Sequence, residues 1–597
     1  MLNALYQYAL QHDLAVLPGF KHKRVKCHFM LSMDGRFLGI DPCSTPTMYC
    51  PDIGSVANGT TKCNVLVEKA CIPLNIVQDE AMDKNISVKH QFFLDALQNG
   101  EQAEPLFTIV RTVLENKTLR NEMTEALSTA KYKPTDIIGF SVDGQALEQR
   151  TGYLGWWSEF RSQFASAASE TLPRCLITGA LAPALATVPK VTGLVHVGGH
   201  TAGDAFLCYD KSAFQSYGFD KSFNAPVSEE AMTAVNAALT ELIAKADVFG
   251  GAKLLHWYSG GAEAEADVLD PLMNGYIWSD EEEDAADNHV GAERDALAAA
   301  QRLVKSLSIG ENPPQTDARY SILPLSGANG RMMVRGWYEG RYADLYRSVQ
   351  TWFDDLRITM PRASGMTRPP KLKTLFLRLL KPGSNSSKDY DRLDKELPNL
   401  LGRSFASIVQ GNPLPDEVAQ RALLWLRSDL LRGTEEPDKQ KKTDTYVYQL
   451  LKAWLRRRQK RKEGVIPMTE TLQPDRIAVA YQCGRLMAVF AAVQASALGS
   501  DLGTGVLERY YATASTSPNL VLGKLSRLSQ YHLAKIGDRK LVTRYERMLS
   551  DIACHIPSGS IPSNLTLEQQ TEFALGYYQQ HAAIFTPSNQ SKENQSA

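Results

Sequence analysis

The sequence predicts an α+β protein, in which a mixed N-terminal region with antiparallel sheet precedes an all-helical C-terminal bundle. Two Asp-Gly dipeptides, at residues 34–35 and 143–144, each follow an extended apolar run, as in tight β-hairpins. After about residue 345 the strand signals fade, and apolar residues recur at the three- and four-residue steps of helices. With 597 residues the chain exceeds one core of ordinary size, so several domains are expected.

The N-terminal half is predicted to contain both helices and strands. Apolar residues at helical spacing from Leu2 to Leu10 indicate a short first helix, and a strand-like run follows through Val25, Cys27 and Phe29. Further on, residues 194–197 and 205–209 are typical of strands and residues 229–246 of a helix. We predict a first α+β region over residues 1–170 and a second mixed α/β region over residues 171–345.

The C-terminal half is predicted to be helical. One apolar stripe runs from Val447 to Leu455 and another from Val479 to Val493. Residues 382–391 are polar enough for a connecting loop, and the prolines at 467 and 474 indicate a linker. We therefore predict a helical region with a basic helix over residues 346–466 and a C-terminal helical bundle over residues 467–597, whose end should fray from about Pro587.

Charge is segregated along the chain, although the formal net charge is only −1. Residues 280–287 hold six carboxylates in eight positions, whereas residues 452–462 hold seven basic residues and no acidic one. No apolar stretch approaches the ~20 residues that span a bilayer, and no signal sequence follows Met1, which predicts a cytoplasmic protein without a membrane partner. The acidic run is expected to be a solvated loop.

The sequence predicts neither catalysis nor a cofactor. It lacks a GxxxxGK phosphate loop, an HExxH metal motif and a GxSxG nucleophile elbow, and its nine cysteines include no CxxC pair. We expect reduced thiols and no metal, with a loosely spaced zinc site at Cys43, Cys50, Cys63 and Cys71 as the alternative. The glycine-rich residues 196–203 are interpreted as a tight turn between strands rather than a phosphate-binding loop.

Three places combine the cations and polar groups that nucleic-acid binding needs. In the first, alternate side chains of one strand present a basic edge. In the second, a polar loop holds an amide that can read base edges, and the lysines on either side of this amide can hold phosphate. The third is the basic end of a helix, where like charges at four-residue spacing cost stability. A solvated strand face, an ordinary loop and a solvated helix end are the alternatives. The candidate residues are Lys21, Lys23, Arg24 and Lys26; Gly59, Lys62, Asn64 and Lys69; and Arg456, Arg457, Arg458, Lys460, Arg461 and Lys462.

Several segments in a shared order resemble the large-subunit family of the type I-C CRISPR interference complex (Cascade). In the N-terminal half they are LPGF at 17–20, DGRF at 34–37, KCNVL at 62–66, FSVDG at 140–144, CLITG at 175–179, FQSYG at 214–218 and NAPVS at 224–228. In the C-terminal half they are GRLMAV at 484–489, RYY at 509–511, ASTSP at 514–518 and LGYY at 575–578. The resemblance covers nearly the whole chain.

The resemblance implies a non-catalytic subunit of a crRNA-guided complex of backbone and handle-binding CRISPR subunits. Such a subunit recognises the protospacer-adjacent motif (PAM) in double-stranded target DNA, aids duplex opening, stabilises the R-loop and recruits a helicase-nuclease for antiviral defence. It makes the 62–69 loop the expected PAM reader, with Asn64 at the base edge and Lys62 on phosphate, and the basic helix a track for displaced DNA or guide RNA. It also implies a separate small subunit, translated from an internal start that we place at Met468. The alternatives are a metal-dependent nuclease using residues 280–287 and a scaffold that binds only protein.

Overall fold

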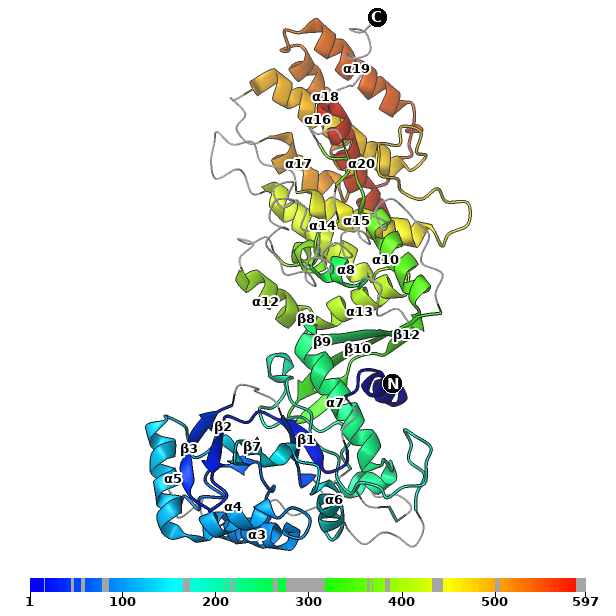
Figure 1. The fold of residues 1–597 in the computed structure, drawn as a ribbon. Coiled ribbons are helices and arrows are strands. Elements are labelled where there is room, and N and C mark those ends of the chain that lie inside the picture. The colour runs from blue at the N-terminus through cyan, green and yellow to red at the C-terminus, as the bar shows by residue number, and fades with distance from the viewer. Residues whose placement is uncertain are drawn as a thin grey trace, which may run out of the picture. The chain divides into compact units, whose positions relative to one another are not determined.

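Strands in the first part of the chain and helices in the second make this an α+β protein, as the sequence predicts (Figure 1). The computed structural model describes residues 1–14, 17–43, 48–54, 60–77, 85–164, 172–209, 211–214, 218–219, 221–260, 267–274, 317–361, 365–367, 369–381, 387–431, 444–499 and 505–586. Contacts divide the chain into two units, residues 1–246 with 325–334 and residues 247–324 with 335–597. The four regions predicted from the sequence remain a prediction.

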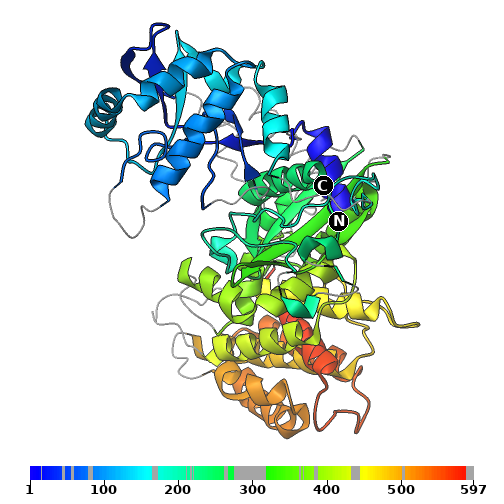
Figure 2. The same cartoon turned by 90° about the horizontal axis from the view of Figure 1, so that it is seen from below.

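A five-stranded sheet forms the centre of the first unit. Its order is β3-β2-β6-β5, with β7 also paired to β6, and β2 runs parallel to β6. Helices α3 to α5 lie against this sheet (Figure 2). Phe29, Phe93 and Phe140 are fully buried in their shared core. The strands are β2 (Cys27–Leu31), β3 (Phe37–Pro42), β5 (Glu68–Lys69), β6 (Ile137–Val142) and β7 (Gln145–Ala146), and the helices are α3 (Ile86–Gly100), α4 (Leu106–Glu115) and α5 (Lys117–Thr129).

Both Asp-Gly dipeptides form the predicted turns. The first closes the β2–β3 hairpin, where Gly35 has a φ of 78°. The second is a two-residue turn between β6 and β7, with φ values of 51° at Asp143 and 76° at Gly144. Positive φ at both central residues defines a type I′ turn, which Asp-Gly adopts at little cost. Local sequence therefore determined both hairpins.

The remaining elements of the first unit are two helices at its ends and shorter segments between them. The predicted first helix is α1, which packs on α7, the helix predicted over residues 229–246 and capped by the Ser228 hydroxyl. The elements are α1 (Leu2–Gln11), β1 (Phe20–Lys23), β4 (Met48–Pro51), η2 (Leu147–Gln149), α6 (Leu154–Ser162), η3 (Val195–Val197), η4 (Ser212–Phe214), η5 (Lys221–Asn224), α7 (Glu229–Lys245) and β11 (Arg331–Val334).

The predicted strands at 194–197 and 205–209 are wrong. The first is the 3-10 helix η3, and the second contributes only an isolated bridge from Ala205 to Arg331. The cause is the glycine-rich stretch between them. Gly199 lies so close to Gly327 that a Cβ on Gly327 would overlap the Gly199 backbone. The glycine-rich segment therefore packs through contact between backbones instead of pairing with a neighbouring strand. Its glycines allow this close contact, because they have no side chain.

The second unit contains a small sheet and a large helical assembly. The sheet places β12, β10, β9 and β8 in that order, from β12 (Tyr338–Arg341), β10 (Arg319–Ala328), β9 (Ala252–Ser259) and β8 (Asp247–Phe249). The helices are α8 (Asp270–Asn274), α10 (Tyr342–Leu356), α11 (Leu372–Phe376), η8 (Leu377–Leu379), α12 (Ser387–Glu396), α13 (Pro398–Val409), α14 (Asp416–Leu431), α15 (Thr445–Gln459), α16 (Val479–Leu498), α17 (Val506–Ala514), η10 (Pro518–Leu520), α18 (Leu522–Leu533), α19 (Arg539–Ala553) and α20 (Leu567–Phe585). Because α12 begins at Ser387, the polar stretch predicted as a loop over 382–391 is helical from that residue on.

The first predicted apolar stripe and most of the second lie in one continuous core, whereas Val493 at the end of the second lies in a separate cluster. Leu451 and Trp454 of α15 share a buried cluster with Cys483 of α16 and Tyr578 of α20, so the core continues across the predicted boundary at residue 466. The expected linker is present as the helix-free segment between α15 and α16. The tail from residue 587, which we expected to fray, lies outside the described residues. None of the helices within the described ranges is long and apolar enough to span a bilayer.

Helices α16 and α20 lie side by side and touch through glycine (Figure 1). A Cβ on Gly484 of α16 would overlap the carbonyl oxygen of Phe573, and one on Gly576 of α20 would overlap the carbonyl oxygen of Tyr481. The two helix backbones therefore meet with no side chain between them. Any larger residue at either position would force the helices apart.

Candidate nucleic-acid interface

The predicted basic edge of the first unit is divided between two sheets. Lys21 and Lys23 lie on β1, which ends at Lys23 and pairs with β4, whereas Lys26 directly precedes β2 of the five-stranded sheet. The prediction of one strand through these residues is wrong, because the chain leaves β1 before Arg24. Lys23 is also engaged: its Nζ donates to the Pro51 carbonyl at 2.6 Å and lies 3.4 Å from Asp52. Lys21, Arg24 and Lys26 are exposed.

The fold brings Lys26 and Lys69 together from opposite sides of β6. The Lys26 N–H donates to the Ile137 carbonyl at 2.8 Å, and Lys69 of β5 is in register with Ile137. Residues in register across neighbouring strands point to the same face, and two strand spacings amount to roughly 10 Å. Both lysines are exposed. Lys26 and Lys69 therefore lie on one face of the sheet as two neighbouring cations, and sequence alone does not give the distance between them.

The loop before β5 holds Asn64 in a fixed orientation. Its Oδ1 accepts from the Ile53 N–H at 2.9 Å, and its Nδ2 donates to Glu68 Oε2 at 2.8 Å. Its backbone N–H donates to the same Glu68 oxygen at 3.0 Å. An amide has two N–H donors and two acceptor lone pairs, so these contacts within the described residues leave one of each. Asn64 is partly buried, and its orientation is set before any ligand arrives.

Apolar residues anchor this loop from below. Val65, Leu66 and Val67 are at most 1% exposed, and Leu66 has a φ of 64°, which is unusual for a leucine. The Cys63 thiol is buried as well and donates to the Lys89 carbonyl at 3.4 Å. Burial raises the pKa of this thiol, which keeps it protonated. The loop is thus an ordered part of the first unit, and Cys63 contributes packing.

Lys62 stands over an aromatic ring. Its Nζ lies 4.4 Å from the centroid of the Phe164 ring, and the lysine side chain is partly exposed. Such a contact holds the ammonium by attraction to the ring face, while donors on the far side stay open to a phosphate. Phe164 was not singled out from the sequence, because its position beside Lys62 depends on the fold. Gly59 lies outside the described residues.

In the second unit, the basic end of α15 surrounds one buried carboxylate. Asp355 of α10 is fully buried, and three cations at the C-terminal end of α15, two within the helix and one directly after it, converge on it. Arg457 Nε lies 2.8 Å from Asp355 Oδ2, whereas Lys460 Nζ and Arg456 Nε lie 3.0 and 3.2 Å from Oδ1. Arg457 is itself only 3% exposed on its side chain. These residues therefore hold α15 against α10.

The outer cations of the same helix end also have acidic partners. Arg458 pairs with Asp416 and, at 2.7 Å, with Glu568, which also accepts from Lys462 at 2.7 Å. Burial alone would raise the pKa of Glu568, but hydrogen bonds from Lys462 and Arg458 lower it. Arg461 donates to the Asn412 side chain at 2.7 Å.

Four carboxylates thus face the six cations from Arg456 to Lys462, so the basic run is partly neutralised inside the protein, and Arg457 has no surface to offer a DNA strand. The other five cations from Arg456 to Lys462 are at least partly exposed. Sequence reasoning missed Asp355, although a signal existed. Asp355 follows Trp352 by three positions and so falls on the apolar face of α10. An acid on an apolar face is a sign of a buried partner.

Lys452 belongs to this buried network. It is fully buried, and its Nζ donates to the carbonyls of Asp355 at 2.9 Å and Asp354 at 3.2 Å. Burial, together with the nearby Arg456 guanidinium, lowers the pKa of Lys452 to about 7. Its ammonium faces the interior of the unit.

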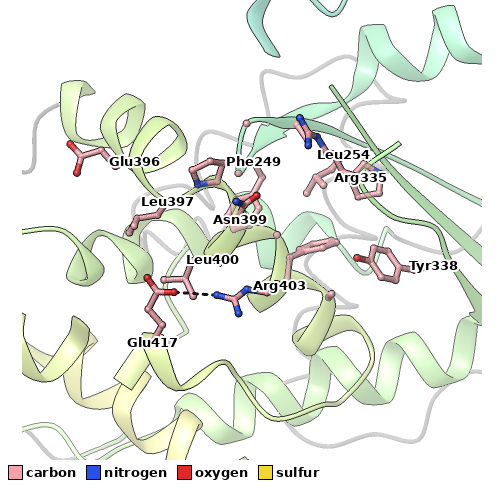
Figure 3. A pocket seen from close by; sticks show the side chains of 18 of the residues that line it. Phe249, Leu254, Arg335, Tyr338, Glu396, Leu397, Asn399, Leu400, Arg403 and Glu417 are labelled. Atoms are coloured by element: carbon pink, nitrogen blue, oxygen red, sulfur yellow. Dashed lines mark hydrogen bonds and ion pairs between the residues drawn. The ribbon is translucent and has the colours of Figure 1, made fainter. Parts of the chain in front are cut away.

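A cavity of about 820 Å³ opens between the β8–β9 turn and helices α13 and α14 (Figure 3). Glu417 points into it from α14 and accepts from Arg403 at 3.1 Å and from Arg421 at 2.9 Å. One carboxylate faces two guanidiniums, so this wall of the cavity keeps an excess of positive charge. Glu396 and Arg335 complete the charged lining.

None of the nine cysteines forms a disulfide, and their exposure is mixed. Cys27, Cys50, Cys63, Cys175 and Cys483 are buried, whereas Cys554 is exposed. Burial raises the pKa of Cys27 and of Cys50 to about 12. Across the described ranges, no three His, Cys, Asp or Glu side chains come close enough together to hold a metal ion. The acidic run at 280–287, on which the nuclease alternative depends, lies outside those ranges.

Comparison with known families gives one match over nearly the whole chain. The model of the family described as "CRISPR-associated protein (Cas_Csd1)" matches residues 2–585. None of the curated proteins compared with the chain matches it. The matched span includes both units and every candidate residue described above.

Proposed function

The chain belongs to the Csd1 family of CRISPR-associated proteins, the large-subunit family of the type I-C Cascade, and we propose that it recognises the PAM in double-stranded target DNA. In this proposal the protein reads a short duplex motif, and base pairing with the guide RNA reads the rest, a division of labour known from single-protein effectors. The subunit then aids duplex opening, stabilises the R-loop and recruits the helicase-nuclease. Cleavage belongs to that partner.

The observation that carries this proposal is the ordered loop around Asn64. A side chain that reads a base edge must be held in position before binding, since ordering it on contact would cost affinity. Asn64 is held by Ile53 and Glu68 and keeps one donor and one acceptor, the pair that an amide presents to an adenine edge. Lys62 supplies a phosphate contact beside it, and Lys69 with Lys26 a second cationic site on the sheet.

The test is binding of the reconstituted crRNA-guided complex to matched duplexes with and without the adjacent motif. We compare wild type with Asn64→Ala and with Lys62→Ala. Loss of a bidentate base contact costs about 1–3 kcal/mol, which corresponds to roughly 5- to 150-fold weaker binding of the motif-containing duplex alone. Lys62→Ala should instead weaken both duplexes, because a phosphate contact carries no sequence information.

Asn64→Ala also removes hydrogen bonds inside the loop, so a matched control is needed. Glu68→Ala breaks one of the same hydrogen bonds, the one that Asn64 Nδ2 donates, together with the one from the Asn64 backbone N–H, and it leaves the Asn64 amide in place. If both variants lose motif discrimination with unchanged melting temperature, the orientation of Asn64 is what matters. Full discrimination in Asn64→Ala would place the reader elsewhere.

The same family membership motivates a proposal for the small subunit. Internal translation from Met468 would release the segment that contains α16 to α20. In the full chain Met468 is fully buried and its N–H donates to Gln459, while the ring centres of Tyr578 of α20 and Tyr448 of α15 lie 4.3 Å apart in a tilted contact. A product that begins there would expose this face to a partner. Mass spectrometry of protein made from the native reading frame would detect it, and only full-length protein would reject it.

A further inference from the structure

A buried arginine connects three segments of the first unit behind the loop around Asn64. Arg161 of α6 is only 5% exposed on its side chain. Its Nη2 donates to the Ile53 carbonyl at 3.2 Å and to Glu229 Oε1 at 2.6 Å, and its Nη1 donates to Glu229 Oε2 at 3.4 Å. Neither Arg161 nor Glu229 was among the candidate residues. The guanidinium links α6, the segment directly after β4 and the first turn of α7.

Ile53 joins Arg161 to Asn64. Its carbonyl accepts from the guanidinium, and its N–H donates to Asn64 Oδ1 at 2.9 Å. The preceding residue is fixed as well, because the Asp52 N–H donates to the Gly19 carbonyl at 2.8 Å. The backbone at positions 52 and 53 is therefore held from two directions. A shift of this backbone would turn the Asn64 amide.

Two glycines leave room for the guanidinium. Gly19 and Gly54 have φ values of 88° and 63°, which favour glycine. A Cβ on Gly19 would lie 2.5 Å from Arg161 Nη1, and one on Gly54 would lie 3.3 Å from Nη2. Trp157, one turn before Arg161 on α6, donates from its Nε1 to the Gly19 carbonyl at 2.6 Å. Backbone from two distant segments thus closes around this one side chain.

A contribution to stability is a poor explanation of this arrangement. A buried ion pair gives little net stability, since the desolvation of both charges offsets their attraction. Arg161 Nε is buried and has no hydrogen-bond partner among the described residues, which adds a further cost. An apolar side chain of similar volume would fill the space without that cost. A buried polar group of this kind is expected where a fixed geometry is needed.

The same end of α6 also contacts Lys62. Phe164, whose ring centroid lies 4.4 Å from Lys62 Nζ, follows Arg161 by three residues, and its N–H donates to the Arg161 carbonyl at 3.0 Å. The two side chains that we assign to the base edge and to phosphate therefore depend on one turn of the chain, residues 161–164. A movement of that turn would displace both.

We propose that Arg161 is a positioning residue for motif recognition. Glu229 fixes its guanidinium, and the guanidinium fixes Ile53 and thereby the orientation of the Asn64 amide. Arg161 itself touches no DNA, because its side chain is buried. This inference rests on the proposed function, since it takes Asn64 as the base reader. An amide whose direction is set in advance loses less entropy when it binds a base edge.

Hydrogen exchange tests the structural step on the full chain without DNA. Arg161→Lys keeps a cation beside Glu229 but removes the planar guanidinium, which donates to two partners at once. Exchange of the Ile53 amide should then become about 2- to 12-fold faster, because its hydrogen bond to Asn64 weakens. Arg150→Lys is the matched control, since Arg150 lies 2.7 Å from the buried Glu104 in the same unit. Equal exchange of the Ile53 amide in wild type and Arg161→Lys would overturn the proposal.

Binding by the reconstituted crRNA-guided complex tests the functional step. Arg161→Lys should weaken binding of the motif-containing duplex by about 5-fold or more, up to the roughly 150-fold that loss of the base contact allows. Binding of the duplex without the motif, and its salt dependence, should stay unchanged, because a buried residue releases no counterions. Glu229→Gln keeps an acceptor for Arg161 and should give a smaller loss of the same kind. It carries the test if Arg161→Lys does not fold. Arg150→Lys should bind both duplexes like wild type.

A double substitution separates positioning from general destabilisation. In an Asn64→Ala background, Arg161→Lys should reduce the preference for the motif no further, because the side chain that it orients is gone. Destabilisation of the unit would instead lower the melting temperature and weaken binding of both duplexes. A further loss of motif preference in the double variant, as large as in Arg161→Lys alone, would overturn the proposal.

Failure of this inference differs from failure of the proposed function. If wild type prefers the motif-containing duplex and Asn64→Ala loses that preference, but Arg161→Lys and Glu229→Gln keep it, only the positioning role fails. If the wild-type complex shows no motif preference while Arg161→Lys still speeds exchange of the Ile53 amide, the proposed function fails. The contact that orients Asn64 then stands without a role in DNA recognition.

Discussion

Replacing Asp355 by asparagine should destabilise the second unit severely. Asp355 is the fully buried carboxylate that faces Arg456, Arg457 and Lys460 at 2.8–3.2 Å. Asparagine has nearly the same size but no charge, so the substitution leaves these cations without their shared counter-ion. Removal of one partner from a buried ion pair typically costs 3–5 kcal/mol, mainly because the remaining charge stays desolvated.

The expected size of the effect on the melting temperature follows from the size of the unit. An unfolding entropy of about 2.1 cal/mol/K per residue, over roughly 340 residues, lowers the melting temperature by about 1.4 °C for each kcal/mol. Asp355→Asn should therefore shift the calorimetric transition of the second unit down by about 4–7 °C. The transition of the first unit should not move.

Asp344→Asn is the matched control, because it removes an aspartate from the same helix. Asp344 accepts from Arg341 at 3.0 Å and Arg347 at 2.7 Å, but its side chain is 43% exposed. Exposed ion pairs contribute about 0–1 kcal/mol, so the shift should stay below about 1.5 °C. Equal shifts for the two variants would refute the view that the α15 cations stabilise the interior of the unit.

Two further changes test the packing and the buried lysine of the second unit. Gly484→Ala should lower the melting temperature, because the added Cβ forces α16 away from α20. Gly523→Ala on α18 is the control: a Cβ there meets nothing within 4 Å, so the melting temperature should stay unchanged or rise slightly. Equal effects of the two substitutions would contradict the close contact between α16 and α20. Lys452, whose pKa is lowered to about 7, holds fewer protons in the folded than in the unfolded state between about pH 7 and 10.5, so stability should rise with pH across this window. In Lys452→Met, the free energy of unfolding should rise with pH by up to about 1.4 kcal/mol less per pH unit than in wild type. Urea unfolding at pH 7, 8 and 9 measures this. If the pH dependence of the unfolding free energy is the same in both proteins, the pKa of Lys452 is that of an ordinary lysine.

The sequence predicted the elements that local chemistry controls. The turns at 34–35 and 143–144 formed because Asp-Gly adopts positive φ at little cost, and α7, α15 and α16 formed where apolar residues recur at helical spacing. Residues 194–197 and 205–209 were misassigned as strands, because the conformation of the glycine-rich stretch between them depends on contact with Gly327, more than a hundred residues away. A backbone contact of this kind leaves no periodic signal.

For the candidate nucleic-acid interface, too, some features follow from the sequence and others only from the tertiary structure. By itself, the sequence determined the order of the family's segments, the α+β class and the positions of the cationic clusters, since each of these depends on neighbouring residues or on resemblance. Only the tertiary structure decided which cations remain exposed. Arg457 and Lys452 are held inside by Asp355 and its carbonyl, whereas Lys540 and Arg547 find no carboxylate among the described residues. Whether a charge is neutralised depends on distances between segments far apart in the chain, and folding alone sets those distances.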